Sequence, residues 1–204
     1  MNLENILPDL VKCFYLSEPI DGELEYSEMP LKVNAEDISG QLLEYYQHLS
    51  FEGDCYFGDQ LFGMILFPAL SESTEPEAWA LQANERFQNR DYIIFAATIS
   101  DDIIFCDIRD EKNPVYGLIS GDDKAIKLSD SLFDFLVFYT KLTKLQVIEF
   151  KKEIYANKNL DYKKDFIERV YSLISNDFSK NVDGLVEFIL SGTLHLIDIN
   201  KESH

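Results

Sequence analysis

Acidic side chains are the strongest candidates for chemistry in this chain. A group of them stands in the turns that separate the apolar segments between residues 91 and 137: Asp101, Asp102, Asp107, Asp110, Glu111, Asp122 and Asp123. Paired carboxylates can bind Mg²⁺ or Ca²⁺, or can share a proton and act as a general acid. Their spacing matches neither an EF-hand loop nor a phosphoryl-transfer motif, and turn geometry itself selects aspartate. Solvated turn acids are therefore favoured over a metal site.

Histidine and cysteine supply no second reactive set. The three histidines are far apart and lack HExxH or HxH spacing: His48, His195 and His204. The cysteines are odd in number and widely spaced, which argues against a disulfide framework or a zinc knuckle: Cys13, Cys55 and Cys106. This usage favours buried thiols in a reducing compartment. The sequence predicts no catalytic residues, no cofactor, no metal site and a cytoplasmic location.

The apolar segments between these turns predict how the acids are positioned. Residues 92–98 are nearly all apolar, which indicates a central strand buried on both faces. Residues 103–108, 115–119 and 125–128 are further short strands. Because only a few residues join them, we expect an antiparallel meander. Ser129 is then the expected cap of a helix.

The rest of the chain predicts helices around further strands. Toward the N-terminus we expect a helix near residues 6–14, an edge strand within 21–33, a helix from a cap at Asn34 to Leu49, and strands at 54–57 and 62–67. Thr74 starts a helix with Trp79, Ala83 and Phe87 on one face. Toward the C-terminus we expect helices within 144–155, 161–174 and 182–190, the last two capped by Asp161 and Asn181, and a final strand at 193–199. This mixture defines an α+β chain with a helical C-terminal extension.

Charge is the most informative bulk property. The chain has 37 acidic and 18 basic residues, a net charge of −19. Residues 1–134 contain 27 of the acids and 8 of the bases, so the whole imbalance lies there and residues 135–204 are neutral. Such a field repels nucleic acid and anionic membranes, and it speeds encounter with basic proteins. An equally simple alternative is that acidity only maintains solubility.

Five motifs in a fixed order resemble the SUKH superfamily, which includes fungal cell-wall-synthesis regulators and bacterial immunity proteins that neutralise toxins. After a helix at about 36–49 come FGMILFP at 62–68, ANERF at 83–87, YIIFAAT at 92–98 leading to a strand that ends in Asp107, PVY at 114–116, and SDSLFDFLVFY at 129–139. The resemblance covers about residues 36–142. It departs from the family at Ser100–Asp102, where the turn is not glycine-rich, and at FEGD, which replaces the usual NGG.

The resemblance implies a single domain over residues 1–204, with helices packed on a twisted, mainly antiparallel sheet and extensions at 1–35 and 143–204. It also implies a non-enzymatic protein that binds a toxin domain, often a nuclease. We therefore interpret six turn acids as part of one anionic surface for a basic protein partner: Asp101, Asp102, Asp110, Glu111, Asp122 and Asp123. The neutral extension at 143–204 is expected to brace the sheet. A regulatory scaffold and a metal-dependent enzyme remain as alternatives.

Overall fold

A seven-stranded antiparallel sheet is the centre of the fold. A computed structural model of the chain describes residues 2–18, 20–34, 37–58, 61–81, 84–88 and 91–196. Neighbouring strands follow sequence order, and each pair is antiparallel. The strands are β1 (Ile20–Tyr26), β2 (Leu49–Phe57), β3 (Met64–Leu66), β4 (Tyr92–Thr98), β5 (Ile103–Asp107), β6 (Val115–Leu118) and β7 (Ile126–Ser129). The predicted α+β class, the meander and the central position of residues 92–98 are confirmed.

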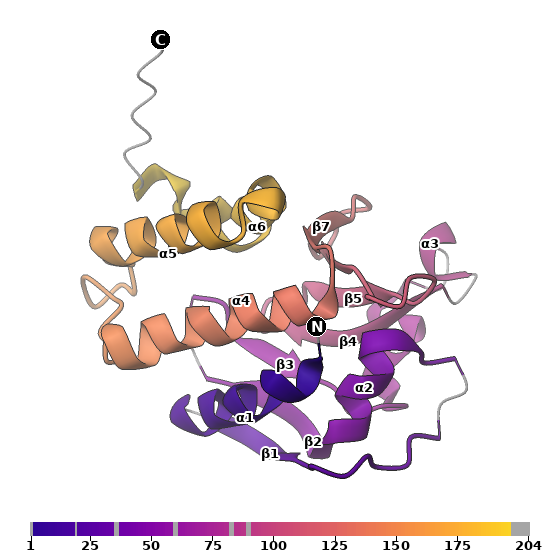
Figure 1. Ribbon diagram of the computed structural model, residues 1–204. Helices are drawn as coiled ribbons and strands as arrows, with labels where there is room; N and C mark the ends of the chain where they lie inside the picture. Colours follow the sequence, from indigo (N-terminus) through magenta and orange to yellow (C-terminus); the bar gives the residue numbers. More distant parts are fainter. Residues whose placement is uncertain are drawn as a thin grey trace.

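Helices cover one face of this sheet. Figure 1 shows α1, α2 and α4 in front of the strands, with α5 and α6 beyond α4. The α-helices are α1 (Leu7–Leu16), α2 (Gly40–His48), α3 (Glu85–Gln88), α4 (Leu132–Lys144), α5 (Lys164–Asp177) and α6 (Val182–Leu190). The short helical turns are η1 (Leu3–Asn5), η2 (Glu72–Thr74), η3 (Pro76–Trp79), η4 (Leu145–Glu149, a π-turn), η5 (Ser179–Asn181) and η6 (Ser191–Leu196).

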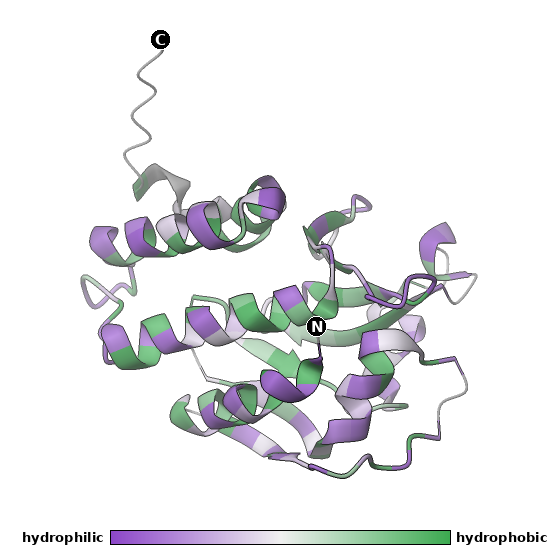
Figure 2. Ribbon diagram, in the orientation of Figure 1, coloured by the Kyte–Doolittle hydropathy of each residue, from purple (hydrophilic) through white to green (hydrophobic). Residues whose placement is uncertain are grey.

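Two hydrophobic clusters fill the two sides of the sheet. The larger lies under the helices and contains buried side chains from Leu3 to Leu190, so both terminal extensions share one core with the sheet. The smaller lies on the opposite face, where Phe67 and Phe105 are covered by the segment that contains η2, η3 and α3, which contributes Phe87 to the cluster. Figure 2 shows the corresponding apolar strands and the mixed polarity of the helices that cover them.

The helix predicted to have its N-cap at Asn34 begins five residues later. Gly40 is the first residue of α2, with a positive φ of 63°, and Ser39 is its N-cap. The Gln41 amide donates to the Glu111 carbonyl at 2.9 Å, and a side chain at Gly40 would collide with that carbonyl. The start of α2 is therefore set by contact with the β5–β6 turn, which local capping signals cannot reveal.

The single helix predicted after Thr74 was also wrong. The chain forms η2 and η3, and Ala80 ends η3 in the left-handed conformation with a φ of 55°. The helix resumes only at α3, while Ala83 lies outside the described residues. The partly buried Trp79 packs on Phe67, and its indole N–H donates to the Ser73 carbonyl at 2.8 Å.

Several helix ends near the C-terminus differ from prediction. Ser131 caps α4 in place of Ser129, because its hydroxyl oxygen accepts the Asp134 amide at 3.0 Å. Lys163 is the N-cap of α5 in place of Asp161, whereas Asn181 precedes α6 as predicted. The final strand was predicted at residues 193–199. This prediction was wrong for residues 193–196, which belong to the helical turn η6, and residues 197–199 lie outside the described residues.

The C-terminal extension packs on the sheet as a brace would. Gly184 lies against the Lys127 carbonyl of β7, where any larger residue would collide. The ring of Phe188 covers Gly117 of β6 in the same way. α6 thus lies along β7, at one end of the strand order, and β1 lies at the other end.

Candidate functional site

The six acids predicted to share one surface lie at two opposite ends of the sheet. In a meander, alternate turns lie at the same end, so the β4–β5 and β6–β7 turns are together and the β5–β6 turn is apart. The first two contribute Asp101, Asp102, Asp122 and Asp123, and the third contributes Asp110 and Glu111. Asp123, however, lines a hollow with Arg86, Asp91 and Arg109, away from the other three acids. The single anionic surface is therefore corrected to a set of three, Asp101, Asp102 and Asp122.

The β5–β6 turn supports the helices through its backbone. Its Glu111 carbonyl accepts the Gln41 amide of α2, and its Lys112 carbonyl accepts the Leu132 amide at 2.9 Å. The fully buried Asn113 side chain accepts from the Leu42 amide at 2.7 Å and donates to the Asp107 carbonyl at 3.2 Å. This turn thus joins two helix N-termini to the sheet.

Asp107 is also a structural acid. The Arg109 guanidinium donates to its two carboxylate oxygens, at 2.9 Å and 2.6 Å, in a bidentate pair. These hydrogen bonds lower the pKa of Asp107, against the opposing effect of its burial. The pair fixes the end of β5, where the resemblance places its strand-terminal aspartate.

The other two turns are connected to each other. One oxygen of the Asp102 carboxylate accepts the Ser120 amide at 2.9 Å, and the other accepts the Thr98 hydroxyl at 3.1 Å. A groove of about 390 Å³ beside them is lined by Asp101 and Asp122 together with Glu77 of η3. The turn acids therefore adjoin the segment that covers the second face of the sheet.

A larger set of acids lies on the antiparallel pair β1 and β2, which are connected through α2. Leu24 and Phe51 face the helix-side core as a cross-strand pair, so their neighbours point to the other face. There Glu23 lies directly opposite Glu52, and like charges in that position are destabilising. Asp54 follows on β2, and its carboxylate accepts the Ser73 hydroxyl of η2 at 3.0 Å. The acids of β1 and β2 thus adjoin the segment that contains η2 and η3.

Together these groups form a surface that we call the acidic face. It comprises Glu23, Glu25, Glu52, Asp54, Glu72, Glu75, Glu77, Asp101, Asp102 and Asp122. None of these carboxylates forms an ion pair with another residue that the structure describes, whereas most charged pairs lie elsewhere, as in Lys141–Asp177 and Lys144–Asp9. The acidic face is thus a surface of uncompensated negative charge.

The acids of β1, β2 and the η2–η3 segment were not predicted as part of the surface, although the sequence contains a signal for them. Residues 20–81 contain thirteen acidic residues and a single base, Lys32. A charge count over shorter windows would have pointed to this segment ahead of the meander turns. Only the strand register, however, places Glu23 opposite Glu52.

The cysteines are buried thiols. Burial is the main cause that raises the pKa of Cys13 to about 11 and that of Cys55 to about 12, and it raises the pKa of Cys106 as well. Within the described residues, no three His, Cys, Asp or Glu side chains are grouped so that they could hold a metal ion. Of the helices in this part of the chain, none is long and apolar enough to cross a membrane.

Comparisons of the chain with protein-family models, with curated proteins and with solved structures found no match in any of the three.

Proposed function

We propose that this chain is a non-enzymatic protein-binding module of the SUKH type, an immunity protein whose acidic face binds and neutralises a basic toxin domain. The observation that carries the proposal is the set of ten carboxylates without ion-pair partners among the described residues. A field of this kind accelerates association with a positively charged partner.

The energetics of the acidic face support a binding role. Placing Glu23 opposite Glu52 costs folding free energy, and nearby bases would have relieved that cost. Solubility alone requires net charge, but it does not require that the charges be opposed on adjacent strands. Like-charged pairs that lower the free energy of unfolding are typical of surfaces selected for interaction.

A nuclease toxin is the partner class that this surface fits best. Nucleases hold phosphate groups with lysine and arginine side chains, so their active-site surfaces are basic. A protein that presents carboxylates in place of phosphates can cover such a surface. The cytoplasm, where a toxin would act, is the location that this function requires.

The test is co-expression with a basic nuclease toxin domain, taken from the gene immediately upstream where that gene encodes a secreted protein with such a domain at its C-terminus. Growth should be rescued by the wild-type chain and not by the double variant Glu52→Lys/Asp122→Lys, whose association rate should fall about 10-fold or more at low salt. The matched control is Asp110→Lys/Glu111→Lys, which reverses the same amount of charge at the opposite end of the sheet. The proposal is contradicted if both variants lose growth rescue and association rate equally, or if the wild-type chain does not rescue growth.

A regulatory scaffold of the same family is the second candidate. It shares the acidic face but binds several cytoplasmic partners in place of one toxin. Pull-down with the wild type and the Glu52→Lys/Asp122→Lys variant distinguishes the two, because an immunity protein should lose one dominant partner.

A further inference from the structure

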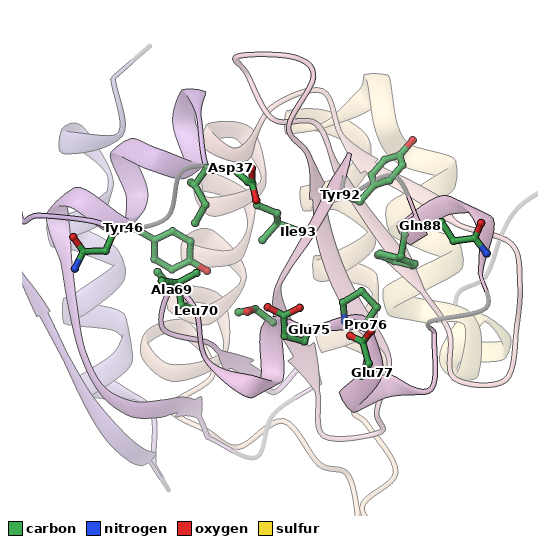
Figure 3. Close-up of a pocket in the computed structure, with 14 residues that line it drawn as sticks. Asp37, Tyr46, Ala69, Leu70, Glu75, Pro76, Glu77, Gln88, Tyr92 and Ile93 are labelled. Carbon is green, nitrogen blue, oxygen red and sulfur yellow. The ribbon is translucent and has the colours of Figure 1, made fainter.

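A pocket opens beside the acidic face, between α2 and the segment that leads into η3. Its volume is about 420 Å³, within the usual range of about 300–1,000 Å³ for small-ligand sites. Apolar walls come from Ile38, Ala69, Phe87 and Ile93. Figure 3 shows these walls approached from α2, from β4 and from the chain around Pro76. The interior is therefore suited to an apolar group of side-chain size.

One polar atom in this pocket has no partner. Tyr46 is only 4% exposed, and its hydroxyl makes no hydrogen bond with any residue that the structure describes. Figure 3 shows the Tyr46 ring projecting from α2 with its hydroxyl toward the pocket. Burial raises the pKa of this phenol, so it stays protonated and can both donate and accept. Buried polar groups are nearly always paired, so this one points to an absent ligand atom.

The mouth of the pocket is negatively charged. Glu75 and Glu77 line it with exposed carboxylates, and no lysine or arginine is among the described residues that line it. Both glutamates belong to the acidic face, and Glu77 also lines the groove beside Asp101 and Asp122. The pocket and the acidic face are therefore one continuous surface.

We propose that this pocket receives an aromatic side chain of the basic partner, a tyrosine or tryptophan flanked by lysine or arginine. This rests on the proposed function and names the anchor of that interaction. The ring would fill the apolar interior, and the flanking cations would meet Glu75 and Glu77. The Tyr46 hydroxyl is covered in the free chain, so the polar atom of the ring would pair with it once the ring has displaced the covering wall. Buried aromatic anchors of this kind dominate the binding energy of protein interfaces.

The test uses short blocked peptides and backbone amide NMR spectra of the full chain. Lys-Tyr-Lys at millimolar concentration should give saturable shifts at Tyr46, Ala69 and Ile93, and Lys-Phe-Lys should bind about 2- to 10-fold more weakly for want of one hydrogen bond. Lys-Ala-Lys and Glu-Tyr-Glu should leave these resonances unchanged. Tyramine serves as a separate arm: binding of tyramine without Lys-Tyr-Lys would indicate a free amine ligand and overturn the side-chain assignment.

Variants separate the pocket from general attraction to the acidic face. Tyr46→Phe should abolish the preference for Lys-Tyr-Lys over Lys-Phe-Lys, and Ala69→Leu should block both peptides by filling the cavity. Glu75→Gln/Glu77→Gln should weaken Lys-Tyr-Lys binding more than the control Glu72→Gln/Glu85→Gln, whose acids do not line the pocket. Thermal unfolding of each variant confirms that it folds.

The two proposals can fail independently. If Tyr46→Phe and Ala69→Leu rescue growth and bind the toxin domain like the wild type, while Glu52→Lys/Asp122→Lys does not, the pocket is no anchor site and the proposed function stands. Absence of saturable shifts with Lys-Tyr-Lys also overturns the pocket assignment. Saturable peptide binding without any growth rescue by the wild type overturns the proposed function and leaves the pocket as a site for aromatic cations.

Discussion

The opposed pair Glu23–Glu52 allows a quantitative test of the idea that the acidic face is costly for folding. Two unit charges about 6 Å apart interact by about 0.7 kcal/mol in water, and salt at 0.15 M screens roughly half of this. Glu52→Lys replaces repulsion by attraction, so the gain approaches twice the repulsion. Because both side chains are exposed and can move apart, we expect stabilisation of about 0.5–1 kcal/mol at low ionic strength.

The assay is a double-mutant cycle with Glu23→Gln, measured by urea and thermal unfolding. For a chain of about 200 residues the gain in Glu52→Lys corresponds to an increase in Tm of about 1–4 °C. The gain should be smaller in the Glu23→Gln background and should shrink as salt is added. The neutral variant Glu52→Gln should fall between wild type and Glu52→Lys. If Glu52→Lys is not stabilising, or if its gain is the same without Glu23, the register-based argument is wrong.

Three further outcomes are expected. Tyr46→Phe should leave the free energy of unfolding unchanged or raise it by about 1 kcal/mol in a urea titration, because no described hydrogen bond is lost; a clear loss would mean that the hydroxyl already has a partner. Gly184→Ala should destabilise by about 1–3 kcal/mol, because the new methyl group meets the Lys127 carbonyl, and hydrogen exchange should increase in α6. The Asp107–Arg109 pair lowers the pKa of Asp107, so its stabilisation is present above about pH 3.9, the usual carboxyl pKa, and is lost as the pH falls through the lower folded value. Asp107→Asn should therefore flatten the acid end of the stability–pH profile, and an unchanged profile would contradict the assignment.

The elements predicted correctly from the sequence are those whose local hydrophobic pattern agrees with their position in the tertiary structure. The meander from β4 to β7 followed from short apolar segments and close turns, and α5 followed from its apolar stripe at Phe166 and Val170. The starts of α2 and α4 were misplaced, because contact with the β5–β6 turn determines both. Residues 74–87 have helical spacing, but their apolar side chains pack on a sheet face, which two short turns satisfy better than one helix.

The candidate surface was predicted in part. Three of the six turn acids belong to the acidic face. Asp110 and Glu111 do not, because alternate turns of a meander point to opposite ends, and Asp123 lies beside Arg86 and Arg109. Proximity in sequence was mistaken for proximity in space. The pocket at Tyr46 could not be predicted, because an unpaired hydroxyl is a property of the assembled tertiary structure.

The two edges of the sheet differ in a way that bears on behaviour in concentrated solution. At β7 the outer edge is occupied by α6, but β1 is paired only with β2 among the described residues and has Asp21, Glu23 and Glu25 along it. Two copies that approach through β1 would bring these charges together, and acidic residues on an edge strand oppose such pairing. We expect light scattering to show dispersed molecules of the wild-type chain and growing association of the variant Asp21→Asn/Glu23→Gln/Glu25→Gln. Removing these charges would then turn the edge of a binding surface into a starting point for aggregation.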